Sequence, residues 1–242
     1  MFYEEGGAQP DRTAALIRRD ICAFDRVCDH LIVIDHAART ARLGRIKPKV
    51  VGTYRLLRAD VAQANFEFYS AGEFDIAPLL QRHRGKNFLE LGSSCVASLW
   101  RGKKVLELLW RGLWAYVQHH RIDVMIGCAS LPGTNLLALA APLAFLHDPA
   151  RGKDEWQIEG LSGRGVPTSN LGGSDFGARK VLAGLLPLIK GYLRAGARFG
   201  TCAVIDYQFR TTDLFVIMPV ADISPRYIAH FNGECAIEKV AA

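Results

Sequence analysis

One carboxylate in an apolar strand is the first residue of this sequence that could carry chemistry. Glu90 interrupts Phe88–Ala97, a run apolar enough to form an interior strand. Burial disfavours a charged carboxylate and raises its pKa, which suits proton acceptance near neutral pH. The side chain could instead point outwards or pair with a nearby arginine such as Arg55. Glu90 is therefore a candidate general base, with an ordinary surface residue or ion pair as the alternative.

A basic turn follows this strand and leads into a helix. Trp100–Lys104 places three basic side chains around one glycine, and Val105–His120 then repeats apolar residues at helical spacing. The free amides of a helix N-terminus that follows a basic turn make a natural pocket for a phosphate. An ordinary strand–loop–helix unit would show the same local pattern. The turn residues concerned are Arg101, Gly102, Lys103 and Lys104.

Signature motifs of several enzyme classes are absent from the sequence. It contains no Gly-x-x-x-x-Gly-Lys-Ser/Thr, no Gly-x-Gly-x-x-Gly, no Gly-x-Ser-x-Gly and no His-Glu-x-x-His. ATP hydrolysis, dinucleotide redox chemistry, serine hydrolysis and zinc proteolysis therefore lose their usual sequence support. No two of the six cysteines form a Cys-x-x-Cys pair. We expect reduced thiols in the cytoplasm and no metal site.

Composition allows one large domain and a weak preference for anionic partners. The chain has 242 residues, is 50% hydrophobic, and carries 30 basic against 24 acidic residues, for a net charge of +6. Anionic lipid, an acidic carrier protein or nucleic acid would each suit that surplus, but no RNA-reading motif or dense basic tract supports the last. The longest apolar run, Leu136–Leu146, is too short to span a bilayer, so we expect a soluble or peripheral protein.

The hydrophobic pattern predicts a mixed α/β sheet in a single domain, 1–242. The expected strands are Asp29–His36, Lys49–Leu57, Phe88–Ala97, Ile122–Ala129, Thr201–Tyr207 and Asp213–Val220, with alternation also in Asn65–Tyr69 and a hairpin loop at Arg39–Lys47. The expected helices are Thr13–Val27, Phe74–Gln81, Val105–His120, Asn135–Leu146, Ala178–Ala195 (broken near Pro187) and Ser224–Phe231. The segment 147–177 is too long for a structureless loop, and we expect a lid or a flexible insertion there.

Several stretches along nearly the whole chain resemble one enzyme family. They are VGTYRLL (51–57), FEFYSAGEFDIAPLL (66–80), FLELGSSCV (88–96), IDVMIGCASLPGT (122–134), LLPLIKGYLRAGA (185–197) and AVIDYQFRTTDLFVIMPV (203–220). Together, and in this order, they resemble the ornithine Nα-acyltransferases, which make the lyso form of bacterial ornithine lipid. That family has a GNAT-like N-acyltransferase fold and is similar to the acyl-homoserine-lactone synthases.

The resemblance implies a reaction and its partners. A 3-hydroxyacyl group would pass from acyl carrier protein to the α-amine of L-ornithine, with the acyl-phosphopantetheine as co-substrate and no metal or redox cofactor. The expected fold is a mixed, mostly antiparallel GNAT-like sheet flanked by helices. The protein would be cytoplasmic, with peripheral contact with an anionic inner membrane left open and no nucleic-acid partner.

The resemblance also implies roles for individual residues. The pantetheine arm would lie beside the Glu90 strand, and the backbone of the basic turn would hold its phosphate, with Gly102 allowing close approach. Glu73 and Asp75 resemble acidic residues on the substrate side of related synthases and could hold the cationic ends of ornithine, or simply cap a helix. Arg55 is a candidate for the ornithine carboxylate, and otherwise a surface residue.

Two departures from the family pattern affect these expectations. The family usually reads Glu-x-x-Arg on this strand, but the position of that substrate-binding arginine is Ser93 here. Either Arg55 or Arg101 covers the role, or the chain is a weakened homologue that only binds carrier protein or membrane. The chain also begins late relative to the family, so we expect part of the first strand and helix to be missing. Acylation of a different amine is a further alternative.

Overall fold

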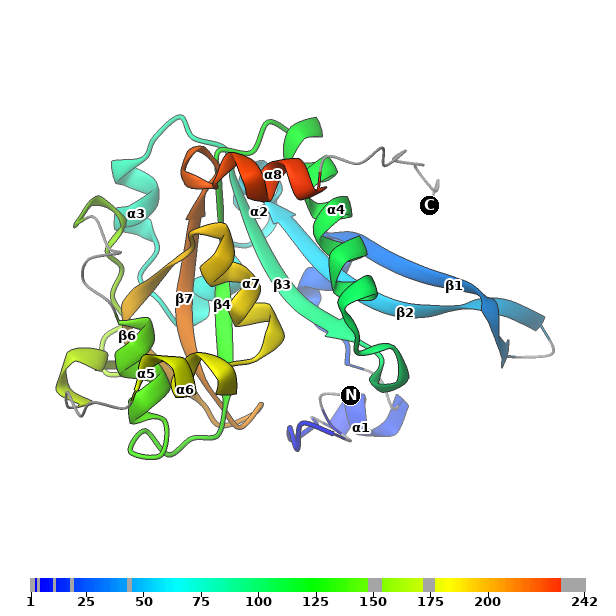
Figure 1. The fold of residues 1–242 in the computed structure, drawn as a ribbon, viewed down its shortest axis with the longest axis horizontal. Helices are drawn as coiled ribbons and strands as arrows, with labels where there is room; N and C mark the ends of the chain where they lie inside the picture. The colour runs from blue at the N-terminus through cyan, green and yellow to red at the C-terminus, as the bar shows by residue number, and fades with distance from the viewer. Residues whose placement is uncertain are drawn as a thin grey trace.

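A seven-stranded sheet forms the centre of the computed structural model of this chain, in the order β1-β2-β3-β4-β7-β6-β5 (Figure 1). The structure describes residues 3, 5–10, 12–17, 20–42, 45–147, 154–171 and 177–231, without the side chains of 39–42, 45, 103, 154, 170 and 171. Strands β3 and β4 run parallel, and the other neighbouring strands run antiparallel. The mixed, mostly antiparallel sheet expected from the sequence is confirmed.

The elements alternate between strands and short helices along the chain. The strands are β1 Asp29–Arg42, β2 Arg45–Arg58, β3 Phe88–Val96, β4 Val124–Pro132, β5 Gly165–Pro167, β6 Arg198–Asp206 and β7 Thr211–Pro219. The α-helices are α1 Arg12–Ile17, α2 Ala59–Asn65, α3 Ala77–Arg82, α4 Lys103–His119, α5 Ala140–Leu146, α6 Ala178–Gly184, α7 Pro187–Ala195 and α8 Pro225–Phe231. Single turns of 3-10 helix include η1 Ala23–Arg26, η2 Tyr69–Gly72, η3 Ser98–Trp100, η5 Asp154–Trp156 and η6 Thr168–Leu171. None of these described helices is both long and apolar enough to cross a membrane.

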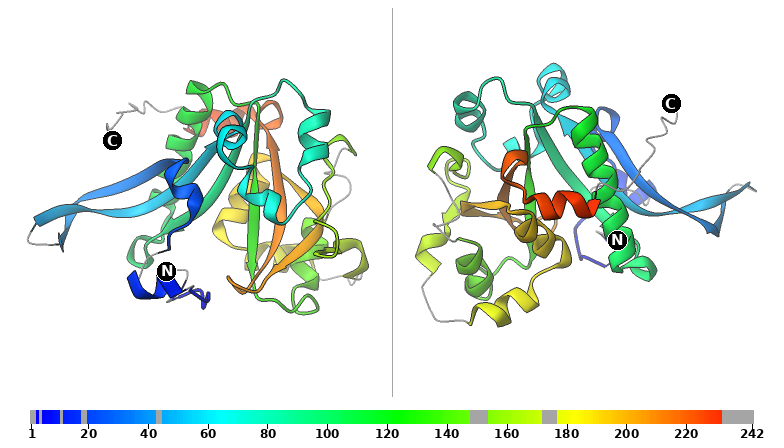
Figure 2. Two further views of the ribbon diagram at one scale, coloured as in Figure 1. Left: turned by 180° about the vertical axis from the view of Figure 1, so that it is seen from behind. Right: turned by 45° about the horizontal axis from the view of Figure 1, so that its top comes forward.

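Helices cover both faces of the sheet and enclose two hydrophobic clusters. On one face α4, α5, α7 and α8 pack against the strands, and α2 and α3 lie on the other, as the view from behind shows (Figure 2). Helix α4 contributes the buried residues Val105, Leu109, Leu113 and Val117, which recur every fourth residue and therefore share one side of the helix. Its Glu107–Arg111 ion pair, at 2.9 Å, joins two residues that lie four positions apart on the helix.

The first hairpin is longer than the sequence suggests. We expected a polar loop at Arg39–Lys47, but β1 and β2 pair out to Arg42 and Arg45. The extension projects beyond the rest of the domain (Figure 1). Only two residues separate the paired ends of the strands, so a nine-residue loop is excluded. Polar residues can extend the hairpin as well as apolar ones, because the hydrogen bonds between strands come from the backbone.

Strands β3 and β4 diverge after four residue pairs, which join Phe88–Leu91 to Val124–Gly127. Beyond that point β3 stays with β2 and β4 stays with β7. In Figure 1 the two strands lie together near the top of the sheet and separate downwards. A β-bulge, in which Ser93 and Ser94 face the single residue Tyr54, bends β3 at the same level. The sheet therefore opens next to the strand that carries Glu90.

Gly127 sits where the two strands begin to separate, and a Cβ atom there would lie 2.5 Å from the backbone oxygen of Leu91. We expect Gly127→Ala to force the strands apart and to lower the free energy of unfolding by about 1–3 kcal/mol. Thermal unfolding measures the effect. Gly184→Ala is the matched control, because a Cβ there meets nothing within 4 Å. If Gly127→Ala is as stable as the control, Gly127 of β4 and Leu91 of β3 do not pack as closely as the structure shows.

Other expected elements differ in part from the structure. Asn65–Tyr69 is not a strand: α2 ends at Asn65, and η2 begins at Tyr69. The described part of the expected lid, 154–171, is packed into the domain, since Trp156 and Ile158 are buried and β5 extends the sheet beside β6. The buried side chains of Trp156 and Ile158 belong to the second cluster, and a lid or flexible insertion stays a prediction. The rest of that segment, 148–153 and 172–176, lies outside the described residues.

Candidate active site

Polar side chains collect on the α2–α3 face of the sheet, beside the point where β3 and β4 separate. Alternation along each strand places Glu90 of β3, Cys128 of β4 and Asp213 of β7 on the same face as the buried apolar residues of the second cluster. Asp206, at the end of β6, continues the row. Four strands far apart in sequence thus bring three carboxylates and a thiol to one side of the opening.

Glu90 is buried, with 4% of its surface exposed, and lies between Leu57 of β2 and Ile126 of β4. Its Oε1 accepts hydrogen bonds from the Ser70 backbone N–H at 2.8 Å and the Ser70 hydroxyl at 2.5 Å. Its Oε2 accepts the Tyr69 N–H at 2.6 Å. The carboxylate therefore holds the turn η2 against the sheet, a role that no sequence pattern indicated.

Two effects act in opposite directions on the pKa of Glu90. Burial is the larger and raises the pKa, while the hydrogen bonds from Ser70 and Tyr69 and the charge of Arg55 lower it. The net result is a raised pKa. An ionised carboxylate offers about four acceptor positions, and three are occupied here. One position, on Oε2, is left for a ligand in the small cavity that Glu90 lines.

Arg55 is a buried residue of β2, so the alternative reading of it as a surface residue is wrong. Its Nη1 donates to Asp25 Oδ1 at 3.1 Å and to the Cys22 sulfur, both in or beside η1. The guanidinium also lies over the ring of Tyr69, 5.2 Å from its centroid. A Cβ on Gly92 would lie 3.4 Å from Nε and 3.5 Å from Nη2, so the guanidinium rests on the β3 backbone beside the bulge.

Ser93 has a left-handed backbone, with φ of 48°, and an exposed side chain. Its position in the bulge explains this conformation, because the extra residue of a bulge cannot keep the strand geometry. Ser93 lines both cavities described below, as does Arg55. Arg55 of β2 therefore brings a guanidinium to the same two cavities that Ser93 lines from β3.

Glu73 and Asp75, which the sequence offered as a pair, lie in different surroundings. Glu73 is buried at the end of η2. Asp75 is exposed, lines neither cavity beside β3, and donates its backbone N–H to Glu159 O at 2.9 Å. It does not cap α3 either, because the N-cap residue is Ile76. Asp75 as a substrate-binding residue therefore stays a prediction.

Glu73 instead has two carboxylate neighbours that sequence reasoning missed. Single ligand oxygens of Glu73, Asp206 and Asp213 lie within 4.8 Å of one another. Burial, followed by the charges of Asp213 and Asp206, raises the pKa of Glu73 to about 7. Burial also raises the pKa of Asp213 to about 6. We call these three residues the acidic cluster. Such a set of oxygen ligands could hold a metal ion or an organic cation.

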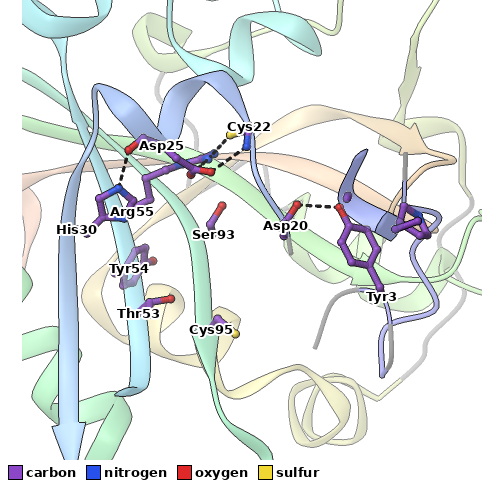
Figure 3. Close-up of a pocket in the computed structure, with 13 residues that line it drawn as sticks. Tyr3, Asp20, Cys22, Asp25, His30, Thr53, Tyr54, Arg55, Ser93 and Cys95 are labelled. Carbon is purple, nitrogen blue, oxygen red and sulfur yellow. Dashed lines mark hydrogen bonds and ion pairs between the residues drawn. The ribbon is translucent and has the colours of Figure 1, made fainter. Parts of the chain in front are cut away.

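Two cavities meet at Arg55 and Ser93. The larger has a volume of about 730 Å³ and lies between the N-terminal segment and strands β2 and β3, with Asp20, Cys22, Asp25, His30 and Thr53 around it (Figure 3). The smaller, about 240 Å³, lies between β3, β4 and β7 and reaches Glu90, Cys128, Ser130 and Asp213. Together they form a path from the surface to the buried carboxylates, lined by both polar and apolar atoms.

The basic turn lies at the end of β3, where α4 begins. Gly102 is the N-cap residue of α4, with no side-chain cap and no acidic residue in the first helical turn. Its backbone is extended, at φ −140°, and a Cβ would meet nothing within 4 Å, so nothing in the chain itself requires glycine there. Lys104 is exposed, whereas Arg101 pairs with Glu5. The side chain of Lys103 lies outside the described part of the chain.

Comparisons with known proteins identify acyltransferases that this chain is similar to. Residues 1–111 match the model of an acetyltransferase (GNAT) domain. The chain is 47% identical over 234 residues to an L-ornithine N(alpha)-acyltransferase of Agrobacterium fabrum, covering 97% of this chain and 78% of that relative. It is 44% identical, with the same coverage of 97% and 78%, to the L-ornithine N(alpha)-acyltransferase of Rhizobium meliloti. Among solved structures, it resembles FeeM, an N-acyl amino acid synthase from uncultured soil microbes, with a TM-score of 0.38 and 10% identity over 91% of this chain and 80% of that one.

Proposed function

Because this chain belongs to the L-ornithine N(alpha)-acyltransferase family, we propose that it transfers a 3-hydroxyacyl group from acyl carrier protein to the α-amine of L-ornithine. The observation that carries the proposal is the opening between β3 and β4, with a buried carboxylate, a buried arginine and an uncapped helix N-terminus around it. The product would be a lyso-ornithine lipid, and the second product the free thiol of the carrier.

The opening suits the acyl donor. A pantetheine arm lying between the strands would reach the first amides of α4, where the helix dipole and Lys104 favour its phosphate. Past Leu91 the N–H groups on this side of β3 no longer face β4, so they are available to the thioester carbonyl oxygen as negative charge develops on it. Arg101 and Lys104 would also face the acidic surface of the carrier.

The acceptor would lie in the cavities beside Arg55. Arg55 holds the ornithine carboxylate through Nε and Nη2, since its Nη1 is already used by Asp25. The fourth acceptor position of Glu90 orients the α-ammonium and takes its proton. The neutral amine then attacks the thioester carbon and the new C–N bond forms. The C–S bond breaks as the thiolate leaves, and the thiolate takes up the second proton, which the nitrogen loses on becoming an amide. The enzyme mainly positions two substrates, because a thioester is already activated.

We also propose peripheral contact with an anionic membrane through the β1–β2 hairpin. One face of the hairpin exposes Ile32, Ile34, Ile46 and Val50, and the exposed Lys47 follows Ile46 on the opposite face of the same strand. Apolar side chains flanked by basic residues favour the surface of an anionic bilayer. A lyso-lipid product is amphipathic and would pass readily to such a surface.

The proposal is tested by turnover with purified substrates. The folded chain, given 3-hydroxyacyl carrier protein and L-ornithine, should release free thiol and form a product with the mass of one acyl chain on ornithine. Fragmentation of the product should place the acyl group on the α-nitrogen. No turnover from a folded chain would favour a weakened homologue that only binds carrier protein, and acylation of another amine alone would assign a different acceptor.

A further inference from the structure

The acidic cluster carries more negative charge than its surroundings balance. Glu73 and Asp213 are buried, at 7% and 5% exposure, and Asp206 is half-buried. None of the three forms an ion pair within the described residues. Buried carboxylates are expensive unless a cation or several hydrogen bonds compensate them.

The hydrogen bonds of the cluster compensate only part of this buried negative charge. Oδ1 of Asp206 accepts the N–H groups of Gln208 at 2.7 Å and Phe209 at 2.9 Å, which closes the β6–β7 turn. Glu73 Oε2 receives a weak bond from the Cys128 thiol at 3.6 Å. Oδ1 of Asp213 is fully buried and has no hydrogen-bond partner among the described residues, although hydrogen bonding from the Ser130 and Thr211 side chains to this carboxyl lowers its pKa in part. A buried acceptor in a cavity wall, without a partner, indicates that a ligand completes the site.

The cluster and the proposed reaction centre share a cavity. Asp206 and Asp213 line the 240 Å³ cavity together with Glu90 and Arg55. Glu73 lines the neighbouring depression, which also contains Asp206. A ligand held by Arg55 and Glu90 at one end can therefore extend towards the cluster with its other end.

From this arrangement we infer that Glu73, Asp206 and Asp213 bind the side-chain ammonium of a diamino acid and make the enzyme selective for such acceptors. The inference rests on the proposed function, since it places the far end of the same substrate. It assigns two aspartates that no sequence motif singled out.

The chemistry of the two amines decides which of them the cluster holds. Several carboxylates around an amine stabilise its ammonium form and raise its pKa. The reacting amine must lose a proton before it can attack the thioester, so an environment of three carboxylates would hinder it. The amine that does not react should remain an ammonium. The α-amine therefore belongs beside the single carboxylate Glu90, and the side-chain amine belongs in the cluster.

The same assignment gives the selectivity a pH dependence. At pH values below about 7 Glu73 takes up a proton in the free enzyme, and Asp213 follows near pH 6. Because the ammonium must then displace these protons, preference for a diamino acid should fall as the pH is lowered. The other groups that act on Glu73 and its neighbour Tyr69 are Asp206, Asp213, Cys128, Arg164 and Arg55. Arg164 and Arg55 keep their positive charge throughout this pH range.

The test compares two acceptors that differ at one position. L-Ornithine ends in an ammonium, and L-2-aminohexanoate carries a methyl group in its place. We expect wild-type kcat/KM to favour ornithine by about 100-fold or more, since an uncharged end leaves the buried carboxylates unpaired. Asp213→Asn and Asp206→Asn should each reduce that ratio at least about tenfold. The ratio for the wild-type enzyme should also decline between about pH 8 and about pH 5.5.

Matched variants and a metal titration make the outcome decisive. Asp206→Asn keeps the oxygen that closes the turn, so it should remain folded, and Asp60→Asn removes an exposed carboxylate of α2 as the control. An unchanged ratio in both cluster variants, with ornithine still acylated, would overturn the inference and leave the proposed function standing. Tight binding of Mn²⁺ to the cluster, together with loss of activity on adding a chelator, would also overturn the inference. No acylation of either amino acid by the wild-type enzyme would instead refute the proposed function.

Discussion

Replacing Glu90 by glutamine should abolish most activity, with kcat/KM for ornithine falling by about 100-fold to 10,000-fold. Glutamine keeps the shape of the side chain but turns one acceptor into a donor. Three donors converge on the two carboxylate oxygens, two from Ser70 and one from Tyr69. Whichever way the amide is turned, its NH₂ group meets a buried N–H. A buried donor without a partner costs about 1–3 kcal/mol, so the variant should also be less stable.

Steady-state kinetics and thermal unfolding of the same variant separate the two roles of Glu90. A general base that also anchors η2 should affect both kcat and stability. Glu159→Gln makes the same chemical change at an exposed position and should alter neither. If Glu90→Gln loses stability but the folded fraction keeps wild-type kcat, Glu90 serves only to hold the turn, and the proton acceptor lies elsewhere.

Replacing Arg55 by methionine should reduce kcat/KM for ornithine by about 100-fold or more, mainly through a higher KM. The side chain is buried and lies at the junction of the two cavities. Methionine keeps the apolar stem but removes the only part that can pair with a carboxylate in a bidentate way. Loss of one partner from a buried, charge-assisted contact typically costs about 2–5 kcal/mol. Asp25 would also lose its partner at 3.1 Å, so a modest loss of stability is expected.

A diamine without a carboxylate distinguishes binding from folding in this variant. 1,4-Diaminobutane is ornithine without its carboxyl group, so the wild-type enzyme should use it far less well. In Arg55→Met the preference for ornithine should largely disappear, because the group that recognises the carboxylate is gone. Arg58→Lys, on the same strand and paired with Asp29 and Asp60, is the control and should keep the preference. A preference that survives in Arg55→Met would place the carboxylate elsewhere.

The sequence carried enough information for most of the fold. The period of Val105, Leu109 and Leu113 located α4, and the break at Pro187 separated α6 from α7. Ser224 and Pro225 marked the start of α8, where the Tyr227 N–H bonds to the Ser224 hydroxyl at 3.2 Å. These features are local, because helix period, breakers and caps act within a few residues.

The parts that the sequence could not supply depend on pairing between distant segments. The β1–β2 hairpin was underestimated because its outer half is solvated and follows no buried pattern. Strand β5 was missed because it is short and lies at the edge, where only its partner β6 defines it. The divergence of β3 and β4 likewise leaves no mark in either strand, since it is set by which neighbour each strand keeps.

The candidate site also combines a residue that the local sequence makes visible with residues that only strand pairing brings together. Glu90 could be found from sequence because a carboxylate inside an apolar run is conspicuous. Asp206 and Asp213 each follow or begin an ordinary strand, and only the antiparallel register of β6 and β7 brings them to one face beside Glu73. Asp75 was named from the family resemblance together with Glu73, but in the structure Glu73 is buried and Asp75 is exposed.

The central claim is that the acyl-pantetheine arm lies in the opening between β3 and β4. A crystal structure with a non-hydrolysable 3-hydroxyacyl-pantetheine 4′-phosphate bound would test it most directly. We predict the arm beside Gly92–Ser94, the carbonyl analogue near Glu90, and the phosphate on the first amides of α4. An arm bound outside this opening, or a phosphate far from Gly102–Lys104, would show that the acyl donor does not bind between β3 and β4.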